Sequence, residues 1–383
     1  MNTALFDYEL PPELIADTPA SRRDASRLML VRRAARTVSH HHFHELPALL
    51  PARTVLFRNN ARVLRARLAG ERPGGGRVEC LLLRPAGSPE TWWCLLKPGK
   101  KAAAAGFALP GPATATVLGQ SDGEYRVHFT LPAGETVLTL SEKKGELPLP
   151  PYIERARRER GTPPCAQLDH ERYQTLYADP RRTVAAAAPT AGLHFSEAVL
   201  SALGARGIPC HDLTLHVGLG TFQPMKTETV EEHTIHREFY EIPSTTLAAF
   251  DAAVASNAPR LAVGTTTLRA LEDHARKHEG GRQGVGAATG MENADARTRP
   301  PAAGGNPVFD EAGLFIHPPC TFLGADALLT NFHLPRSTLL CLVSAFLSPG
   351  TMDGIEWFKS LYAEAIARSY RFYSYGDAML ILD

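Results

Sequence analysis

The feature that most constrains the fold of this 383-residue chain is a unit that occurs three times. Each unit has an apolar strand, a short polar turn, and a helix with a Ser or Thr at its start. The units are TVAAAAPTAGLHF with EAVLSALGARG, LAVGTTT with LRALEDHA, and ALLTNFHLPRS with TLLCLVSAFL. Alternating strands and helices are typical of α/β folds, whose ligands bind beyond the carboxyl ends of the strands. We therefore expect the three turns to form one ligand site.

The segment between Arg62 and Pro148 has a different pattern, with short apolar runs bounded by Gly and Pro. The runs are VECLLL, TWWCLL, ATATVL, YRVHF and TVLTL, each about the length of a strand. Closely spaced short strands indicate a small β-barrel or sandwich. We therefore predict a small β-barrel domain at 63–150, which interrupts a large α/β domain with a mixed sheet formed by 1–62 and 151–383.

Two further segments complete the predicted organisation. Residues 276–307 are rich in Gly, Ala and Pro without periodicity, so we expect a flexible surface insertion there. Residues 355–370 have an amphipathic helical pattern, and the last residues of the chain are typical of a buried strand.

Composition excludes several classes of protein. A hydrophobic content of 44% and a charged content of 21% are typical of a soluble globular chain. The longest mainly apolar run, at 339–347, is far shorter than the ~20 residues of a membrane span, and the N-terminus has no secretory pattern. The six Cys form no C-x-x-C pair, so a zinc ribbon is not expected. We expect a cytoplasmic monomer with no membrane contact.

Charge is unevenly distributed, although the formal net charge is only +1. Between Arg22 and Arg67 there are eleven Arg and two acidic residues, and IERARRER at 153–160 is a second basic cluster. Guanidinium groups suit phosphates and stacked bases, so this distribution favours an enzyme that acts on nucleic acid. The alternative is an ordinary solvated face.

Histidines in or near the turns are the candidate catalytic residues. His194 and His333 lie in two of the turns, and His216 lies in TLHVGLGTF. Histidine titrates near neutral pH and serves as a general acid or base. Gly192 would allow the backbone to approach a ligand closely. A single buried His, however, is more often a structural residue with hydrogen-bond partners.

Other site classes have weaker support. His233 and His236 are three residues apart and could bind a metal with a nearby Glu, but no H-E-x-x-H frame is present. VGLGTF lacks the third Gly of a dinucleotide fingerprint, and neither a Walker A loop nor G-x-S-x-G occurs. We therefore predict no metal site and no hydrolase elbow.

Ten ordered blocks of the sequence together resemble one family, the S-adenosylmethionine:tRNA ribosyltransferase-isomerases of queuosine synthesis. The blocks are FDYELPPELIA, RDASRLM, FRNNARVLRARL, LDHERYQTLYA, AAPTAGLHF, LTLHVGLGTFQP, EEHTIHREFYEI, VGTTTLRALE, LLTNFHLPRSTLLCLVSAF and YRFYSYGDAMLI. The resemblance spans almost the whole chain. Departures from the family pattern include Ala61 in place of Thr and Pro319 in place of Gly.

The resemblance implies an α/β domain interrupted by a small β-barrel, and it implies a reaction. The ribosyl part of S-adenosylmethionine is transferred to 7-aminomethyl-7-deazaguanine at the wobble position of tRNAs with G-U-N anticodons. Epoxyqueuosine forms, and adenine and methionine leave. S-adenosylmethionine is then a cosubstrate, and no prosthetic group is expected.

This chemistry suggests roles for individual residues. We expect His194 or His333 to be the base, and His216, Gly218, Gly220 and Thr221 to hold the ligand. Phe195, Phe222 and Phe332 would face the sulfonium or pack in the core. Thr265, Thr266 and Arg269 would bind the methionine carboxylate or a tRNA phosphate. The other expected substrate-binding residues are Asn59, Asn60, Arg62, Thr190, His233, His236, Asn331 and Asp377, the last of which alternatively caps local backbone.

Two alternative functions remain at this point. A non-catalytic tRNA-binding protein would explain the arginines but not the polar residues at three strand ends. An S-adenosylmethionine-dependent RNA methyltransferase would use the same cosubstrate but would leave adenine attached to it.

Overall fold

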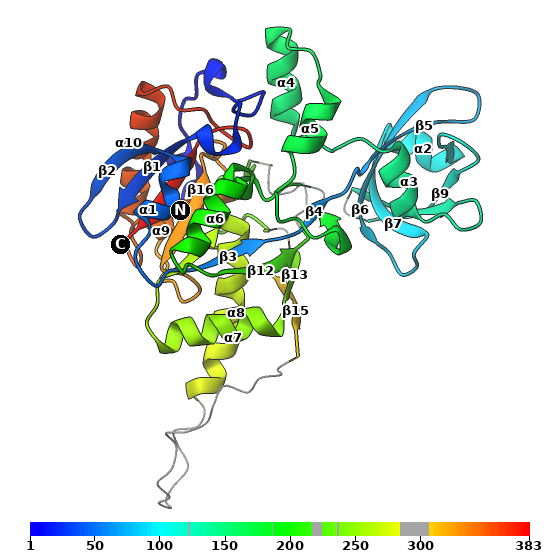
Figure 1. Cartoon of the computed structure of the whole chain (residues 1–383). Coiled ribbons are helices and arrows are strands. Elements are labelled where there is room, and N and C mark those ends of the chain that lie inside the picture. Colours follow the sequence, from blue (N-terminus) through cyan, green and yellow to red (C-terminus); the bar gives the residue numbers. More distant parts are fainter. Residues whose placement is uncertain (122, 186, 217–223, 236, 284–305) are drawn as a thin grey trace, which may run out of the picture.

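The computed structural model describes residues 1–121, 123–185, 187–216, 224–235, 237–283 and 306–383. It contains an α/β body and a closed β-barrel, with α4 (Pro151–Arg160) and α5 (Ala166–Arg172) between them (Figure 1). The predicted fold class, a mixed α/β sheet with a small β-barrel, is confirmed.

The α/β body is built on a nine-stranded sheet with the order β15-β13-β12-β3-β14-β16-β17-β1-β2. Its centre is parallel, from β12 through β3 and β14 to β16, and antiparallel pairs flank this centre. The strands are β1 (Arg27–Arg32), β2 (Thr37–His42), β3 (Val55–Asn59), β12 (Cys210–Leu215), β13 (Glu238–Ile242), β14 (Arg260–Val263), β15 (Val308–Ala312), β16 (Ala327–Asn331) and β17 (Ala378–Leu382).

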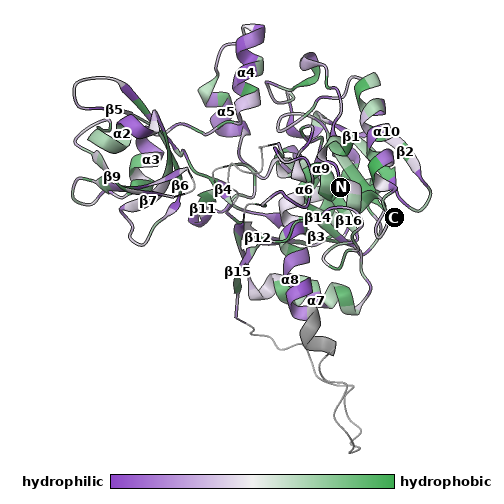
Figure 2. Ribbon diagram, turned by 180° about the vertical axis from the view of Figure 1, so that it is seen from behind, coloured by the Kyte–Doolittle hydropathy of each residue, from purple (hydrophilic) through white to green (hydrophobic). Residues whose placement is uncertain are grey.

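Helices cover both faces of this sheet. Successive residues of β1 alternate between two core clusters, with Leu28 and Leu30 in one and Met29 and Val31 in the other. Both faces are therefore buried, and the strands around β1, β14 and β16 are mainly apolar (Figure 2). The helices of the body are α1 (Leu46–Leu49), α6 (Glu197–Ala205), α7 (Ser244–Ala255), α8 (Thr265–Gln283), α9 (Thr338–Leu347) and α10 (Gly354–Ala367).

Two of the predicted helix caps are present. Ser196 accepts a hydrogen bond from the backbone N–H of Val199 at the start of α6, and Ser337 accepts one from Leu340 at the start of α9. Between β14 and α8, Gly264 has φ +93°, which an L side chain rarely adopts. Helix caps and a glycine with positive φ thus fix the conformation of these turns.

One of the three units differs from the expected pattern. Its strand, β11 (Thr183–Ala185), does not join the large sheet but pairs in parallel with β4 (Arg62–Val63) in a separate two-stranded sheet. The following turn forms a 3-10 helix, η6 (Thr190–His194). The other 3-10 helices are η1 (Thr3–Phe6), η2 (Pro12–Leu14), η3 (Arg23–Ala25), η4 (Phe43–Glu45) and η5 (Pro180–Arg182).

The barrel is antiparallel and closes in the order β10-β7-β6-β5-β8-β9. Four predicted strands are present, but TVLTL was wrongly predicted to be a strand. It begins α3 because Thr136 accepts a hydrogen bond from the N–H of Thr139, which caps a helix. The elements are β5 (Arg67–Glu71), β6 (Arg77–Pro85), β7 (Thr91–Lys97), α2 (Gly99–Ala105), β8 (Phe107–Ala108), β9 (Thr114–Ser121), β10 (Glu124–Thr130) and α3 (Val137–Lys144).

The predicted insertion at 276–307 begins too early, because α8 continues to Gln283. Residues 284–305 lie outside the described part of the chain. The predicted C-terminal helix and buried strand are confirmed as α10 and β17. Within the described residues, every helix is too short or too polar to cross a bilayer.

Candidate active site

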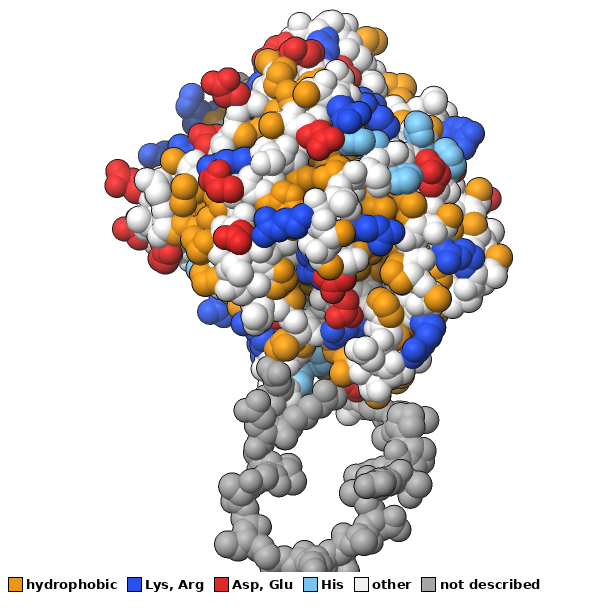
Figure 3. Space-filling view, turned by 90° about the vertical axis from the view of Figure 1, so that its left-hand side faces the viewer, with side chains coloured by type: hydrophobic (Ala, Val, Ile, Leu, Met, Phe, Trp, Pro, Cys, Tyr) orange, Lys and Arg blue, Asp and Glu red, His pale blue; other side chains and the backbone are white. Residues whose placement is uncertain are grey.

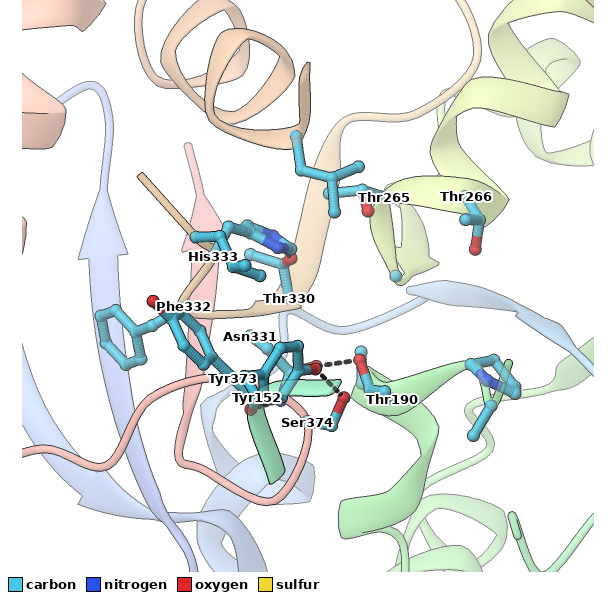
Figure 4. Close-up of a pocket in the computed structure, with 16 residues that line it drawn as sticks. Tyr152, Thr190, Thr265, Thr266, Thr330, Asn331, Phe332, His333, Tyr373 and Ser374 are labelled. Atoms are coloured by element: carbon cyan, nitrogen blue, oxygen red, sulfur yellow. Dashed lines mark hydrogen bonds between the residues drawn. The ribbon is translucent and has the colours of Figure 1, made fainter. Parts of the chain in front are cut away.

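A pocket of about 560 Å³ lies where the turns after β14 and β16 meet η6. Its lining includes residues 188–191, 264–266 and 330–334, together with Tyr152, Tyr373 and Ser374 (Figure 4). The three turns identified in the sequence therefore do come together. We call this the active-site pocket.

His333 lines the active-site pocket and is only 8% exposed. Its Nε2 lies 2.7 Å from Thr330 Oγ1, and its backbone N–H donates to the Tyr362 hydroxyl. Within the described residues, its other ring nitrogen, Nδ1, has no hydrogen-bond partner. Burial lowers the pKa of His333 to about 3, so the imidazole is neutral at neutral pH.

His194 has a different environment. Its Nδ1 lies 2.7 Å from Ser26 Oγ and its Nε2 lies 3.1 Å from Asn331 Nδ2, so both ring nitrogens have buried partners. The ring stacks on Phe43, with centroids 5.1 Å apart. Burial lowers the pKa of His194 to about 4, so this ring is also neutral. His194 does not line the active-site pocket, and the expectation that it shares a cavity with His333 is wrong.

Asn331 connects the two environments. Its Nδ2 donates to His194, and its Oδ1 accepts a hydrogen bond of 2.8 Å from the Thr190 hydroxyl. Asn331 and Thr190 both line the active-site pocket. His194 thus orients a polar side chain of the pocket without entering it.

A second pocket of about 490 Å³ shares Thr265, Thr266 and Leu339 with the active-site pocket. His233 and Arg269 also line it. Arg269 lies 3.2 Å from Glu238 and donates to the backbone carbonyl of Ala312. Of the predicted residues around the start of α8, Thr265 and Thr266 line the active-site pocket, and Arg269 lies beside it.

Several expected ligand contacts belong to the core. Phe195 is fully buried and packs edge-on against Phe43 and Tyr177. Gly192 is needed because a Cβ there would lie 2.1 Å from the Tyr177 hydroxyl. Phe332 is also fully buried in an aromatic cluster with Tyr362 and Phe372, but it is one of the residues that line the active-site pocket. Phe195 therefore corresponds to the core-packing alternative, and the expectation that Gly192 admits a ligand is wrong, because both positions pack against Tyr177.

The NNAR segment also forms internal contacts. Asn59 is fully buried, and its Oδ1 accepts hydrogen bonds from Ala61 and Leu215. Asn60 accepts a hydrogen bond of 2.7 Å from Thr214, and Arg62 lies 3.4 Å from Glu142. The contacts of Asn59 and Asn60 fix the end of β3 next to β12, and the Arg62 pair joins β4 to α3.

Asp377 binds the protein itself. Its carboxylate accepts hydrogen bonds from the backbone N–H and guanidinium of Arg27 and from the backbone N–H of Arg371. Both carboxylate oxygens of Asp377 are thus occupied by the protein. This is the alternative in which Asp377 caps local backbone.

His216 is the last described residue before a gap. Burial, with a smaller contribution from Arg182, lowers its pKa. Gly218, Gly220, Thr221, Phe222 and His236 lie outside the described residues, so their expected roles remain predictions. In the part of the chain with described positions, no group of three His, Cys, Asp or Glu could hold a metal ion.

Many of the arginines at 22–67 are paired within the protein, so they do not form one block of free positive charge. Acidic residues distant in sequence neutralise many of these arginines, and Lys and Arg are scattered among acidic and apolar side chains in Figure 3. Ion pairs are formed by Arg22, Arg27, Arg33, Arg36, Arg58, Arg62 and Arg67. Backbone carbonyls accept hydrogen bonds from Arg23, Arg53 and Arg65.

Sequence reasoning missed four hydroxyl-bearing residues that line the active-site pocket, Tyr152, Thr330, Tyr373 and Ser374. Thr330 holds His333, and Tyr152 donates to or accepts from Ser374 through its hydroxyl. The ring centroids of Tyr152 and Tyr373 are 4.7 Å apart. The polar and aromatic YSYG run at 373–376 was a signal for this part of the site, whereas nothing local marked Tyr152.

Comparison with known proteins gives consistent matches. The model of a family described as "Queuosine biosynthesis protein" matches residues 3–381. Proteins from Citrifermentans bemidjiense and Geobacter metallireducens, both called S-adenosylmethionine:tRNA ribosyltransferase-isomerase, are each 44% identical and are matched over 98% of either chain. A crystal structure of S-adenosylmethionine tRNA ribosyltransferase from Thermotoga maritima is 30% identical, with a TM-score of 0.50, and the match covers 99% of this chain and 100% of that one.

Proposed function

Because this chain belongs to the queuosine biosynthesis protein family and is an enzyme of tRNA modification, we propose its complete reaction. The enzyme transfers and isomerises the ribosyl group of S-adenosylmethionine onto 7-aminomethyl-7-deazaguanine at the wobble position of tRNA. Epoxyqueuosine forms, with release of adenine and methionine. The observation that carries the proposal is the convergence of three polar turns around the neutral, buried His333.

The reaction begins with removal of a proton from carbon. The sulfonium acidifies the ribose 5′ C–H because it stabilises the resulting ylide. The ylide opens the ribose ring and expels adenine. The aminomethyl nitrogen of the deazaguanine then attacks the sugar, and closure of the epoxide expels methionine.

We assign the base to His333. It lines the pocket, and its Nδ1 has no hydrogen-bond partner within the described residues, whereas both nitrogens of His194 are occupied. A low pKa keeps His333 in the form that accepts a proton. Proton transfer from the sulfonium substrate to His333 also leaves the total charge of the pocket unchanged. Before the transfer the substrate is a cation and the imidazole is neutral. After it the ylide is neutral overall and the imidazolium carries the positive charge. The desolvation that opposes an isolated imidazolium is therefore partly offset.

Asn331 and Thr190 would hold the ribose or adenine. Their side chains are joined by a hydrogen bond of 2.8 Å at the edge of the pocket, and His194 fixes the Asn331 amide from behind. His194 is thus a positioning residue in this scheme.

The methionine carboxylate would lie toward the start of α8. Thr265 and Thr266 stand at the N-terminus of this helix, which favours an anion, and Arg269 is one turn further along. On the other side, Tyr152 and Tyr373 offer aromatic faces to the wobble base, a common mode of recognition for an unstacked RNA base.

The proposal is tested by incubating the enzyme with tRNA that carries the deazaguanine and with S-adenosylmethionine labelled in its ribose. We expect release of adenine and methionine and transfer of label to the RNA. Formation of S-adenosylhomocysteine would instead identify a methyltransferase. RNA binding without consumption of the cosubstrate would identify a non-catalytic binding protein.

A further inference from the structure

A third pocket, of about 250 Å³, lies beside the active-site pocket and shares Ser374 with it. Its lining includes Arg23 from η3, Arg172 from the end of α5, and Arg371, together with His194. We call it the arginine pocket. Three guanidinium groups from segments far apart in sequence meet there, which is unusual because like charges repel.

These three charges are poorly neutralised. Arg23 donates to the backbone carbonyls of Glu171 and Leu193, and Arg172 donates to that of Ala20, at distances of 2.7–3.1 Å. Within the described residues, neither arginine has a carboxylate within ion-pair distance.

Arg371 is held in the same way. It donates to the carbonyl of Thr18, and its Nε lies 4.0 Å from Asp377, whose carboxylate is already bound by Arg27 at 3.0 Å. Neutral carbonyls therefore orient all three guanidinium groups. Because carbonyls carry no net charge, the positive charge of these groups can still attract an anion.

The energetics of the empty pocket also favour an anion. Burial lowers the pKa of Arg23 and of Arg172, and repulsion between neighbouring arginines lowers them further, opposed by the exposed Glu171. Arg172 is only 9% exposed, and its buried Nε has no acceptor among the described residues. An anionic oxygen placed among the three guanidinium groups would reduce the repulsion between them.

We propose that the arginine pocket binds one phosphodiester group of the substrate RNA, adjacent to the nucleotide whose base enters the active-site pocket. This inference rests on the proposed function. Position favours a phosphate over the methionine carboxylate, because the active-site pocket lies between the two others. It shares Thr265 and Thr266 with the second pocket and Ser374 with the arginine pocket. The start of α8 already serves the carboxylate, and guanidinium forks suit phosphate oxygens.

The test uses the full chain and a synthetic anticodon stem-loop RNA with an unmodified guanine at the wobble position. Binding is measured by fluorescence anisotropy over a range of salt concentrations. The variants are Arg371→Gln, whose side chain is 33% exposed, and Arg23→Gln/Arg371→Gln. The control is Arg36→Gln, because Arg36 is exposed, pairs with Asp353 and lines none of these pockets. Thermal melting confirms that each variant is folded.

We expect Arg371→Gln to weaken RNA binding about tenfold, as for loss of a charge-assisted hydrogen bond. The slope of log K against log salt should become less steep by at most about 0.7–0.9, the value for one phosphate, because Arg23 and Arg172 remain in this variant. The double variant should bind more weakly still, and its loss of slope should approach this limit, because both residues bind the same phosphate. Arg36→Gln should bind like the wild type.

Unchanged RNA affinity and slope in a folded Arg371→Gln protein would overturn the inference. A fall in S-adenosylmethionine affinity with RNA binding intact would overturn it too, because the pocket would then hold the carboxylate. Neither result depends on turnover. If RNA binding falls as expected but the wild type releases no adenine, the phosphate site stands and the proposed function fails.

Discussion

His194 and His333 are both nearly inaccessible to solvent and both neutral, yet their surroundings differ. His194 is held on both ring nitrogens, by Ser26 and Asn331, and stacks on Phe43. His333 is held through Nε2 by Thr330 and lines the active-site pocket. Burial alone therefore does not distinguish a base from a structural imidazole. The difference is whether a ring nitrogen is left for a ligand.

The largest expected effect is on catalysis by His333. His333→Gln should lower the rate of adenine release by about 10²–10⁴, the usual contribution of a positioned acid or base. Affinity for S-adenosylmethionine, measured by calorimetry, should change little because Gln preserves size and polarity. Wild-type turnover in this variant would show that another group removes the proton.

The next largest effect is on stability, where replacing His194 should have a larger effect than replacing His333. His194→Ala removes a stacked ring and leaves Ser26 and Asn331 without their partner, so we expect a loss of about 2–4 kcal/mol in the free energy of unfolding. His333→Ala should cost less, since one side of this ring faces the pocket. Urea denaturation of both variants compares them. Equal losses would contradict the distinction drawn here.

Acid should weaken the fold through both residues. Burial lowers the pKa of His194 to about 4 and of His333 to about 3, compared with about 6.5 in an unfolded chain. The unfolded state therefore binds more protons as pH falls below about 6.5, and stability decreases. Between pH 7 and pH 5 each His should contribute a loss on the order of 2 kcal/mol.

Thermal melting of the wild type and of His194→Gln across this pH range measures the effect. The variant should show the smaller dependence on pH. An identical dependence in both proteins would mean that His194 is not a buried neutral group.

The smallest effect is expected at Thr190. Thr190→Val removes its hydrogen bond to Asn331 but keeps the shape, which should cost about 1 kcal/mol. Turnover should fall severalfold with an unchanged pH profile, because no titrating group is removed. A shift of the pH profile would instead place Thr190 in contact with the base.

The sequence predicted local patterns well and long-range pairing poorly. The periodic runs that became α9, α10 and β17 were identified because their patterns depend on neighbouring residues. The convergence of the three turns was predicted from a general rule, that ligands of α/β folds bind beyond the carboxyl ends of the strands. The ion pairs of the arginines at 22–67 could not be predicted, because their acidic partners, such as Asp212, Glu154 and Asp377, lie far along the chain. Tyr152 reaches the pocket from α4, and no local pattern could place it there.

A crystal structure of this protein with S-adenosylmethionine bound tests the assignment of the site most directly. We predict that the nucleoside lies in the pocket formed by residues 188–191, 264–266 and 330–334, with its 5′ carbon about 3–3.5 Å from His333 Nδ1, a distance suited to reaction. A ligand whose 5′ carbon lay against His194, or outside this pocket, would contradict it.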